Sequence, residues 1–300
     1  MICAIIGSTK IAEVHIHELV KNKVEQIYII SRFKKKRINL LNKIVSRYKD
    51  KNTNFKSSNI NILKKKKFDL IDICSSNHVH DKHLKYISGQ KTIILIEKPI
   101  ISLLKYKKDY LNFLDDIYRE NKKLIVIYPM TKLARSIDNL VNINDKIKNF
   151  SFNFKVGGKY FYKNIIIDLI PHALSFTNYF FKFSSNKKKF FIHSVKIKKN
   201  SCIAKFKYSG SNISFYFSEK INQRTILTIN INNLKIQRLT KNKIENFINY
   251  LKFKKNIKII KNPITEFFNE FFKNKNNKLY YKKNKDLTYE IMKRSVGFIN

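Results

Sequence analysis

The chain has 300 residues, of which 43% are hydrophobic and 13% aromatic, and a formal net charge of +41. The apolar content is enough to form packed cores, which excludes a chain that is disordered throughout, and the length predicts two domains of roughly 150 residues each. The charge by itself favours a nucleic acid or another polyanion as partner, but only 8 of the 62 basic residues are Arg, the residue that nucleic-acid surfaces prefer.

The abundant lysine has a simpler explanation than polyanion binding. Lys, Ile and Asn, which all have A/T-rich codons, together supply 136 residues. An A/T-biased genome produces this composition without selection for binding. We therefore expect no specific nucleic-acid partner and keep a polyanion-binding protein as the weaker alternative.

The cysteines and the apolar runs indicate the cellular compartment of the protein. Cys3, Cys74 and Cys202 are far apart, so neither a disulfide framework nor zinc-type spacing is expected. No apolar run approaches the ~20 residues that cross a bilayer, and the chain opens without a basic signal segment. We expect a soluble protein of the reducing cytoplasm that has no membrane partner.

Residues 1–130 alternate buried strands with amphipathic helices, which is the pattern of a parallel, doubly wound sheet with right-handed crossovers. The expected strands are 2–6, 26–31, 68–74, 92–96 and 124–128. The expected helices are 11–21, 38–48, 81–88 and 103–121.

After about residue 130, apolar residues recur at every second position, as in Phe150, Phe152 and Phe154. This spacing predicts an antiparallel sheet with one wet face. The helices expected here are 132–141, 166–181, 264–272 and 287–299, and the Lys/Asn-rich stretch 273–285 is expected to be a loop.

The first motif, Gly7–Ala12, lies between the first strand and the first helix, where dinucleotide-binding proteins carry G-x-G-x-x-G/A. Gly7 permits a tight turn, Ala12 permits close packing of helix on strand, and the helix N-terminus offers free amides to a pyrophosphate. Thr9 stands at the second glycine position. The expected cofactor-binding residues here are Gly7, Ser8, Thr9, Lys10 and Ile11.

The second motif is the end of the second strand, Ser31-Arg32, followed by a basic run to Arg37. In an NAD site this strand ends in a carboxylate that bonds the ribose 2′-hydroxyl. A Ser and an Arg suit a 2′-phosphate instead, so the predicted cofactor is NADP, with NAD as the alternative. The lysines of the run carry little information in so lysine-rich a chain.

The third motif follows the next two strands. Ser75, Asn77 and His80 come after the strand that ends at Cys74, and Glu97-Lys98-Pro99 ends the strand after it. Ligands bind at the carboxyl ends of parallel strands, and a Lys there can hold a positive charge near a reacting carbonyl. An ordinary polar strand end is the alternative.

The fourth motif is Asp168…His172, whose spacing places both side chains on one helix face. The carboxylate can orient the imidazole and favour its charged form, which suits a general base. The alternative is a helix N-cap at Asp168. No third ligand has metal-type spacing, so no metal site is expected, and surface or cofactor-edge positions are expected for His15, His17, His80 and His83.

Taken in order, these motifs resemble the glucose–fructose oxidoreductase / inositol dehydrogenase (Gfo/Idh/MocA) family. The resemblance is strongest over Phe68–Ile100 and covers residues 1–130 well. It implies an α/β protein with an N-terminal Rossmann-type domain, 1–125, and a C-terminal α/β domain with an open, mainly antiparallel sheet, 126–300. The last helix is expected to return to the first domain.

The resemblance also implies a reaction and roles for the motif residues. The reaction is hydride transfer between a nicotinamide cofactor and a hydroxyl or carbonyl carbon, usually of a sugar or cyclitol. The catalytic set carried over is Lys98, Asp168 and His172, with Glu97 at the cofactor ribose and Asn77 on the nicotinamide side. The expected partner is a small sugar-like substrate, and a homo-oligomer through the C-terminal sheet is left open. The alternative within the family is a non-catalytic sensor or assembly protein that binds nucleotide.

Overall fold

The computed structural model describes residues 1–106, 108–143, 145–183, 190–241 and 248–299. The chain divides into two compact units. One comprises Met1–Ile127 and Phe267–Tyr289, and the other comprises Tyr128–Glu266 and Glu290–Asn300. No helix of the described residues is long and apolar enough to span a membrane.

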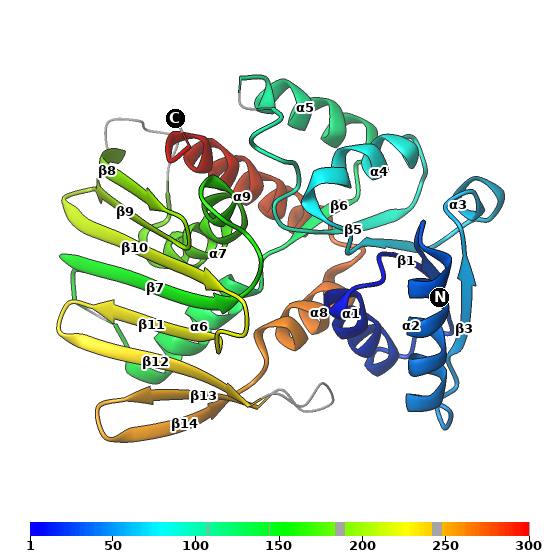
Figure 1. The fold of residues 1–300 in the computed structure, drawn as a ribbon, viewed down its shortest axis with the longest axis horizontal. Coiled ribbons are helices and arrows are strands. Elements are labelled where there is room, and N and C mark those ends of the chain that lie inside the picture. The colour runs from blue at the N-terminus through cyan, green and yellow to red at the C-terminus, as the bar shows by residue number, and fades with distance from the viewer. Residues whose placement is uncertain (107, 144, 184–189, 242–247, 300) are drawn as a thin grey trace. The chain divides into compact units, whose positions relative to one another are not determined.

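The first unit is built on a six-stranded parallel sheet with the order β3-β2-β1-β4-β5-β6 (Figure 1). The strands are β1 (Ile2–Ile6), β2 (Gln26–Ile30), β3 (Asn54–Ser58), β4 (Leu70–Ile73), β5 (Ile93–Glu97) and β6 (Leu124–Ile127). The helices between them are α1 (Lys10–Lys21), α2 (Lys34–Arg47), α3 (Ile62–Lys65), α4 (His80–Tyr86) and α5 (Tyr110–Glu120), with a 3₁₀ turn at Asn77–Val79. The doubly wound sheet predicted from the sequence is confirmed.

Burial along the strands explains which of them the sequence revealed. Every residue of β4 and β6 is buried, as expected for strands that are covered on both faces. The edge strand β3 has the polar sequence Asn-Phe-Lys-Ser-Ser and no fully buried residue, so neither apolar continuity nor alternation marked it. It was not predicted.

The helix predicted at 103–121 is wrong at its start, because α5 begins only at Tyr110. Ile100, Ile101 and Leu103 are fully buried in the irregular segment that follows β5, and their spacing imitated a helix face. Lys107, within the predicted helix, lies outside the described residues.

The loop predicted at 273–285 is also wrong. Helix α8 (Pro263–Asn274) is followed almost at once by α9 (Lys278–Gly297). The Asn284 side chain of α9 accepts a hydrogen bond from the Val126 N–H (2.8 Å) and donates one to the Val126 carbonyl (2.9 Å). Tertiary contacts with β6 therefore stabilise a helix whose lysine-rich sequence looked like a solvated connector.

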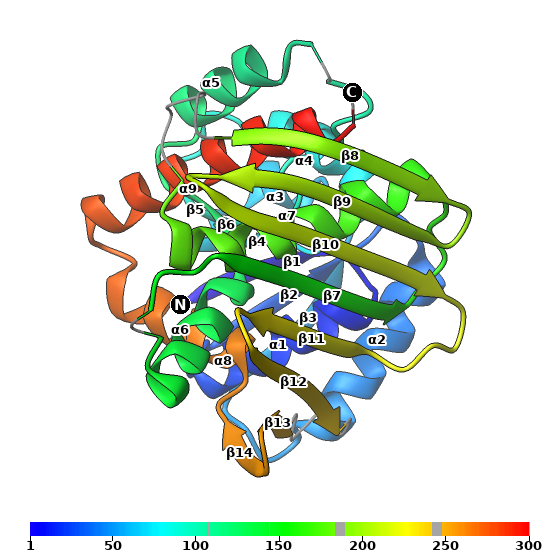
Figure 2. The same cartoon turned by 90° about the vertical axis from the view of Figure 1, so that its left-hand side faces the viewer.

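The second unit contains an eight-stranded sheet with the order β14-β13-β12-β11-β7-β10-β9-β8, seen face-on in Figure 2. Only the β7–β10 pair is parallel among its described pairs, which confirms the predicted mainly antiparallel sheet. The strands are β7 (Asn149–Gly157), β8 (Phe190–Lys198), β9 (Ser201–Tyr208), β10 (Ser211–Lys220), β11 (Ile226–Ile231), β12 (Leu234–Lys241), β13 (Ile248–Phe253) and β14 (Asn256–Ile260).

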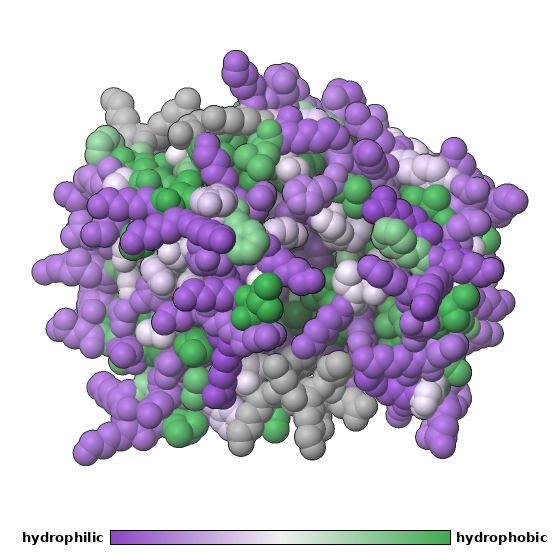
Figure 3. All heavy atoms as spheres, viewed as in Figure 1, coloured by the Kyte–Doolittle hydropathy of each residue, from purple (hydrophilic) through white to green (hydrophobic). Residues whose placement is uncertain are grey.

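Helices cover one face of this sheet. They are α6 (Pro129–Val141) and α7 (Lys163–Phe181), which lie behind the sheet in Figure 2. The alternating Phe150, Phe152 and Phe154 of β7 are buried, and the Phe152 ring lies 5.4 Å from that of Phe176 on α7. The period-two pattern thus marks the residues that face these helices. Hydrophilic residues are scattered over the face drawn in Figure 3.

Candidate active site

The turn between β1 and α1 is packed directly onto the end of β4. Gly7 has φ +152°, and its N–H donates to the Ile30 carbonyl at 2.9 Å. A Cβ at Gly7 would lie 2.8 Å from the Cys74 carbonyl oxygen, closer than side-chain carbons approach backbone oxygens. Only glycine therefore fits this turn, as expected for a backbone that must come close to a neighbouring strand and to a ligand.

The N-terminus of α1 follows this turn. Thr9 is exposed and extended (φ −100°, ψ 175°), and its side chain makes no capping hydrogen bond. A helix leaves its first N–H groups without intrahelical partners, and its N-terminal dipole end favours an anion. Ala12 is completely buried, which allows α1 to approach the sheet closely. This end of α1 suits a phosphate group.

The end of β2 meets the glycine turn. The Ser8 hydroxyl donates to the Ser31 Oγ at 3.1 Å, so the first and second sequence motifs come together in the fold. Arg37, from the first turn of α2, donates to the Ser31 carbonyl at 2.9 Å. Ser31 Oγ also accepts the Phe33 N–H at 3.3 Å. These bonds fix the direction in which the chain leaves the strand.

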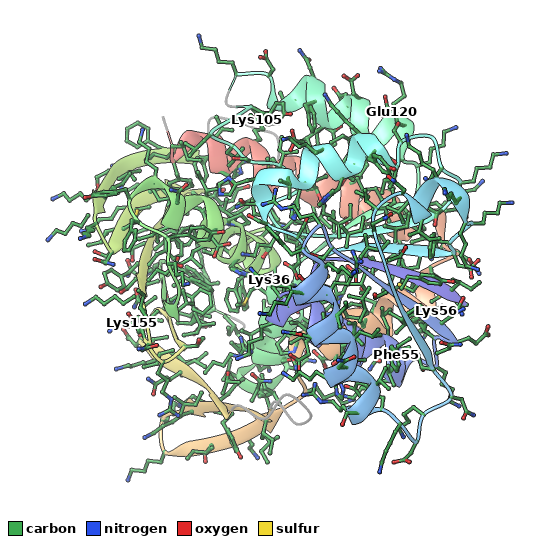
Figure 4. The ribbon with its side chains drawn as sticks, turned by 45° about the vertical axis from the view of Figure 1, so that its right-hand side comes forward. Lys36, Phe55, Lys56, Lys105, Glu120 and Lys155 are labelled. Carbon is green, nitrogen blue, oxygen red and sulfur yellow. The ribbon has the colours of Figure 1, made fainter. Side chains whose placement is uncertain are left out.

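A basic, aromatic surface continues from this point. The Arg32 guanidinium lies 4.4 Å from the centre of the Phe33 ring, and Lys36 Nζ, labelled in Figure 4, lies 5.0 Å from it. Phe33 is 48% exposed, an unusual exposure for a large apolar side chain next to charged groups. Residues 31–37 include no carboxylate. We call Arg32, Phe33 and Lys36 the basic ledge.

Two loops follow β4 and β5 and are held together by one ring. His80 Nδ1 lies 2.8 Å from the Pro99 carbonyl oxygen, and Nε2 lies 2.9 Å from the Ser75 carbonyl oxygen. His80 is completely buried, so a surface position, one of its two expected places, is wrong, whereas the cofactor-edge position stays a prediction. The ring fixes the two loops that carry the third motif.

Asn77 and His83 both belong to the segment that follows β4. Asn77 is 7% exposed, and its Oδ1 has no hydrogen-bond partner among the described residues. Ser75 Oγ and His83 Nδ1 are hydrogen-bonded at 2.9 Å. Burial, together with nearby His80, lowers the pKa of His83 to about 4, so its ring is neutral at pH 7.

Glu97 is the last residue of β5, and Lys98 and Pro99 follow it across a cis Lys98–Pro99 peptide bond. Glu97 and Lys98 are both half-buried. The Glu97 carboxylate contacts the ring of His15, with Oε1 3.0 Å from Nε2. The sequence expectation for His15, a surface or cofactor-edge position, is wrong because His15 is completely buried.

His15 lies at the centre of a buried polar cluster. Its Nδ1 lies 3.0 Å from Asp72 Oδ2 and 3.0 Å from Cys74 Sγ, and the Cys74 thiol lies 3.4 Å from Asp72 Oδ1. Burial alone would lower the pKa of His15, but the charge and hydrogen bond of Asp72 outweigh it and hold this pKa well above its usual value. Burial and Asp72 raise the pKa of the Cys74 thiol, which keeps it protonated.

Two sequence signals point to this cluster. His15 lies three residues after Ala12 and four before Leu19, on the apolar face of α1. Asp72 interrupts the apolar run of β4. A polar residue within a buried pattern requires a partner, and each of these two residues supplies the other's.

Among the described residues, His15, Asp72 and Cys74 form the one group whose potential metal-ligand atoms all lie within 4.8 Å of one another. Their 3.0 Å contacts are hydrogen-bond distances. Bond lengths of 2.0–2.3 Å around tetrahedral zinc would separate two donor atoms by about 3.3–3.7 Å. The spacing is therefore that of a hydrogen-bonded network.

The fourth motif lies on α7 of the second unit. Asp168 falls well inside the helix, which begins at Lys163, so the N-cap alternative is wrong. Asp168 and His172 are one turn apart and both half-buried, as their spacing predicted. The His172 ring meets the Phe154 ring edge-on at 5.7 Å. The two side chains share one face of α7 and are accessible enough to meet a ligand.

Residues 1–127 match the Gfo/Idh/MocA family model, described as "Oxidoreductase family, NAD-binding Rossmann fold". No curated protein sequence matches the chain.

Solved structures share the fold over nearly the whole chain. Myo-inositol 2-dehydrogenase from Lactobacillus plantarum is 14% identical with a TM-score of 0.65, covering 99% of this chain and 96% of that one. KijD10, a 3-ketoreductase from Actinomadura kijaniata in complex with TDP-benzene and NADP, is 9% identical with a TM-score of 0.68 and coverages of 98% and 95%. The WlbA (WbpB) dehydrogenase from Thermus thermophilus, in complex with NAD and UDP-GlcNAcA, is 11% identical with a TM-score of 0.68 and coverages of 100% and 95%.

At these identities the solved structures establish the fold. The family match, the parallel strand order and the glycine-only turn agree in one respect: residues 1–127 match the NAD-binding Rossmann domain of the Gfo/Idh/MocA oxidoreductase family.

Proposed function

We propose that the protein is an NADP(H)-dependent oxidoreductase acting on a hydroxyl or carbonyl carbon of a sugar-like substrate. The observation that carries the cofactor choice is the basic ledge beside the Ser8–Ser31 hydrogen bond. Arg32 and Lys36 offer positive charge where an NAD site carries a carboxylate, and Phe33 supports both cations through its ring face. A 2′-phosphate is the anion that suits this position.

The residues of the first unit fit a dinucleotide. Gly7 allows the turn to lie directly against the Cys74 backbone, and α1 presents an N-terminus without a side-chain cap. The buried Asn77 Oδ1, without a partner among the described residues, is an acceptor suited to a carboxamide N–H. Together these features favour a cofactor that runs from the basic ledge past Gly7 to Asn77.

A nicotinamide cofactor, when bound, supplies or accepts the hydride. In the proposed assignment His172 accepts the hydroxyl proton, and Asp168, one turn earlier on α7, orients the imidazole. Lys98 places a positive charge near the developing alkoxide, or donates a proton in the reverse direction. Glu97 bonds the cofactor ribose, as the family resemblance implies.

A sugar-like substrate is supported by the ligands of the relatives. One is a myo-inositol dehydrogenase, and the other two bind sugar-nucleotide or related diphosphate ligands by their descriptions. The proposed substrate class is therefore a polyhydroxylated carbon ring, free or attached to a carrier.

Calorimetry with NADPH and NADH tests the cofactor choice. Loss of a charge-assisted pair costs ~1.5–3 kcal/mol, so Arg32→Ala should weaken NADPH binding roughly 10- to 100-fold and leave NADH binding unchanged. Lys35→Ala, which removes a nearby charge with no contact to Phe33, is the matched control. Equal affinity of the wild-type protein for NADH and NADPH would refute the assignment.

A panel of sugars and cyclitols, followed by nicotinamide absorbance, tests the chemistry. Once a substrate is found, His172→Ala and Lys98→Met should each lower kcat by ~10²–10⁴-fold while NADPH binding persists. Near-normal turnover in either variant would remove that residue from the mechanism. Tight NADPH binding without turnover on any member of the panel would favour the alternative, a nucleotide-binding relative without catalysis.

A further inference from the structure

We propose that His15 is a positioning residue that acts as a permanent imidazolium clamp, bridging the Asp72 and Glu97 carboxylates and thereby fixing the strand end that presents Lys98. The proposal rests on the proposed function, because it assigns His15 a task in the same site. No sequence motif marked His15 for this task.

The geometry allows both ring nitrogens to donate to a carboxylate. Nδ1 faces Asp72 Oδ2 at 3.0 Å, and Nε2 faces Glu97 Oε1 at 3.0 Å. Ionised carboxylates only accept hydrogen bonds, and a neutral imidazole has a single N–H. A neutral ring would therefore turn a lone pair toward one of the two carboxylates, whereas the imidazolium satisfies both.

Burial makes this clamp strong and specific. The side chains of His15 and Asp72 are fully buried, and that of Glu97 is only 14% exposed. A buried charge is stable only when it is paired and hydrogen-bonded. The groups that face the ring are Asp72 and Cys74 from the β4 side, Glu97 from β5 and the edge-on ring of Phe268 from α8, 5.2 Å away.

The clamp connects α1, the helix proposed to bind phosphate, with the strand end next to the proposed catalytic residue Lys98. His15 lies on α1, the helix that begins immediately after the glycine turn. Asp72 and Glu97 lie on adjacent paired strands, where Asp72 pairs with Leu95. One ring thus links the phosphate-binding helix to the last residue of β5, and the next residue is Lys98.

The protonation state is measurable in the intact protein without any cofactor. Long-range ¹H–¹⁵N NMR of histidine-labelled protein should show both His15 nitrogens protonated from pH 5 to pH 9. The exposed ring of His78 provides an internal reference signal. A neutral His15 at pH 7 would overturn the proposal.

Asp72→Asn separates positioning from packing. The amide keeps the volume and one acceptor at Nδ1 but removes a charge, so the pKa of His15 should fall. The ratio of the NADPH dissociation constants of Asp72→Asn and wild type should then rise at least fivefold as the pH is raised through the His15 titration of the variant. Its midpoint should match the His15 midpoint seen by NMR, because only the imidazolium holds Glu97.

Cys74→Ala is the matched control, since it removes a second contact of Nδ1 and leaves both carboxylates in place. Its dissociation-constant ratio should vary less than twofold with pH. An Asp72→Asn ratio that does not follow the His15 titration would show a purely structural role and overturn the proposal. If the wild-type protein binds no dinucleotide, the proposed function fails, while the NMR measurement still decides the state of His15.

Discussion

Gly7→Ala tests the reasoning about the glycine turn most directly. The substitution places a methyl group 2.8 Å from the Cys74 carbonyl oxygen and 2.9 Å from its carbonyl carbon, both backbone atoms of the sheet. It also holds a residue with a side chain at φ +152°. Backbone strain in a glycine-only region costs about 1–3 kcal/mol, and overpacking against rigid neighbours costs about 1–3 kcal/mol more. The free energy of unfolding should therefore fall by about 2–6 kcal/mol.

Gly89→Ala separates strain from overlap. Gly89 also has a positive φ (+76°), but a Cβ there meets nothing within 4 Å, and both glycines belong to the first unit. Its cost should be limited to about 1–2 kcal/mol of backbone strain. Urea denaturation followed by circular dichroism compares the two variants in the same unfolding unit. A Gly7→Ala protein as stable as Gly89→Ala would refute the inference that the turn is pressed onto β4.

Three further predictions concern stability and charge. Asn284→Ala leaves the Val126 N–H and carbonyl without their side-chain partner and should lower the free energy of unfolding by roughly 2–4 kcal/mol, whereas Asn284→Asp, which keeps one bond, should lose about half of that. The pKa of His83 is lowered to about 4, so between pH ~6.5 and 4 the unfolded chain binds a proton that the folded chain does not. The free energy of unfolding should therefore fall as the pH drops through that range. Urea denaturation at pH 7 and pH 5 should show a smaller fall for His83→Gln than for the wild-type protein. The +41 charge should give only weak, salt-sensitive nucleic-acid binding, and submicromolar affinity in filter binding at physiological salt would contradict this.

The sequence by itself was sufficient for the elements with strong periodicity. β1 and β6 are continuous apolar runs because both their faces are covered, and β7 alternates because only one of its faces is. Gly7 and Ala12 meet a local requirement, the close approach of α1 to the sheet. Their roles could therefore also be recognised from the sequence. The Asp168–His172 spacing needed only helix geometry.

Other features depended on contacts between distant segments. α9 begins at Lys278 and is held to β6 by the hydrogen bond between Asn284 and Val126, which are 158 residues apart. No local sequence pattern predicts that bond. β3 pairs at an edge with a polar sequence and has no periodicity to detect.

The buried polar cluster around His15 depends most clearly on contacts between distant segments. His15 and Asp72 are 57 residues apart, and His15 and Glu97 are 82 apart. Each is visible in sequence only as a polar residue in a buried pattern or at a strand end. Their meeting at one ring is set by the strand order, which places β4 and β5 side by side beneath α1. The sequence determined that a glycine turn, a basic strand end and a Glu-Lys-Pro motif exist. The tertiary structure alone decided that a buried histidine of the helix after that turn meets Asp72 and the Glu of Glu-Lys-Pro, because the topology of the sheet, and not proximity along the chain, sets its hydrogen-bond partners.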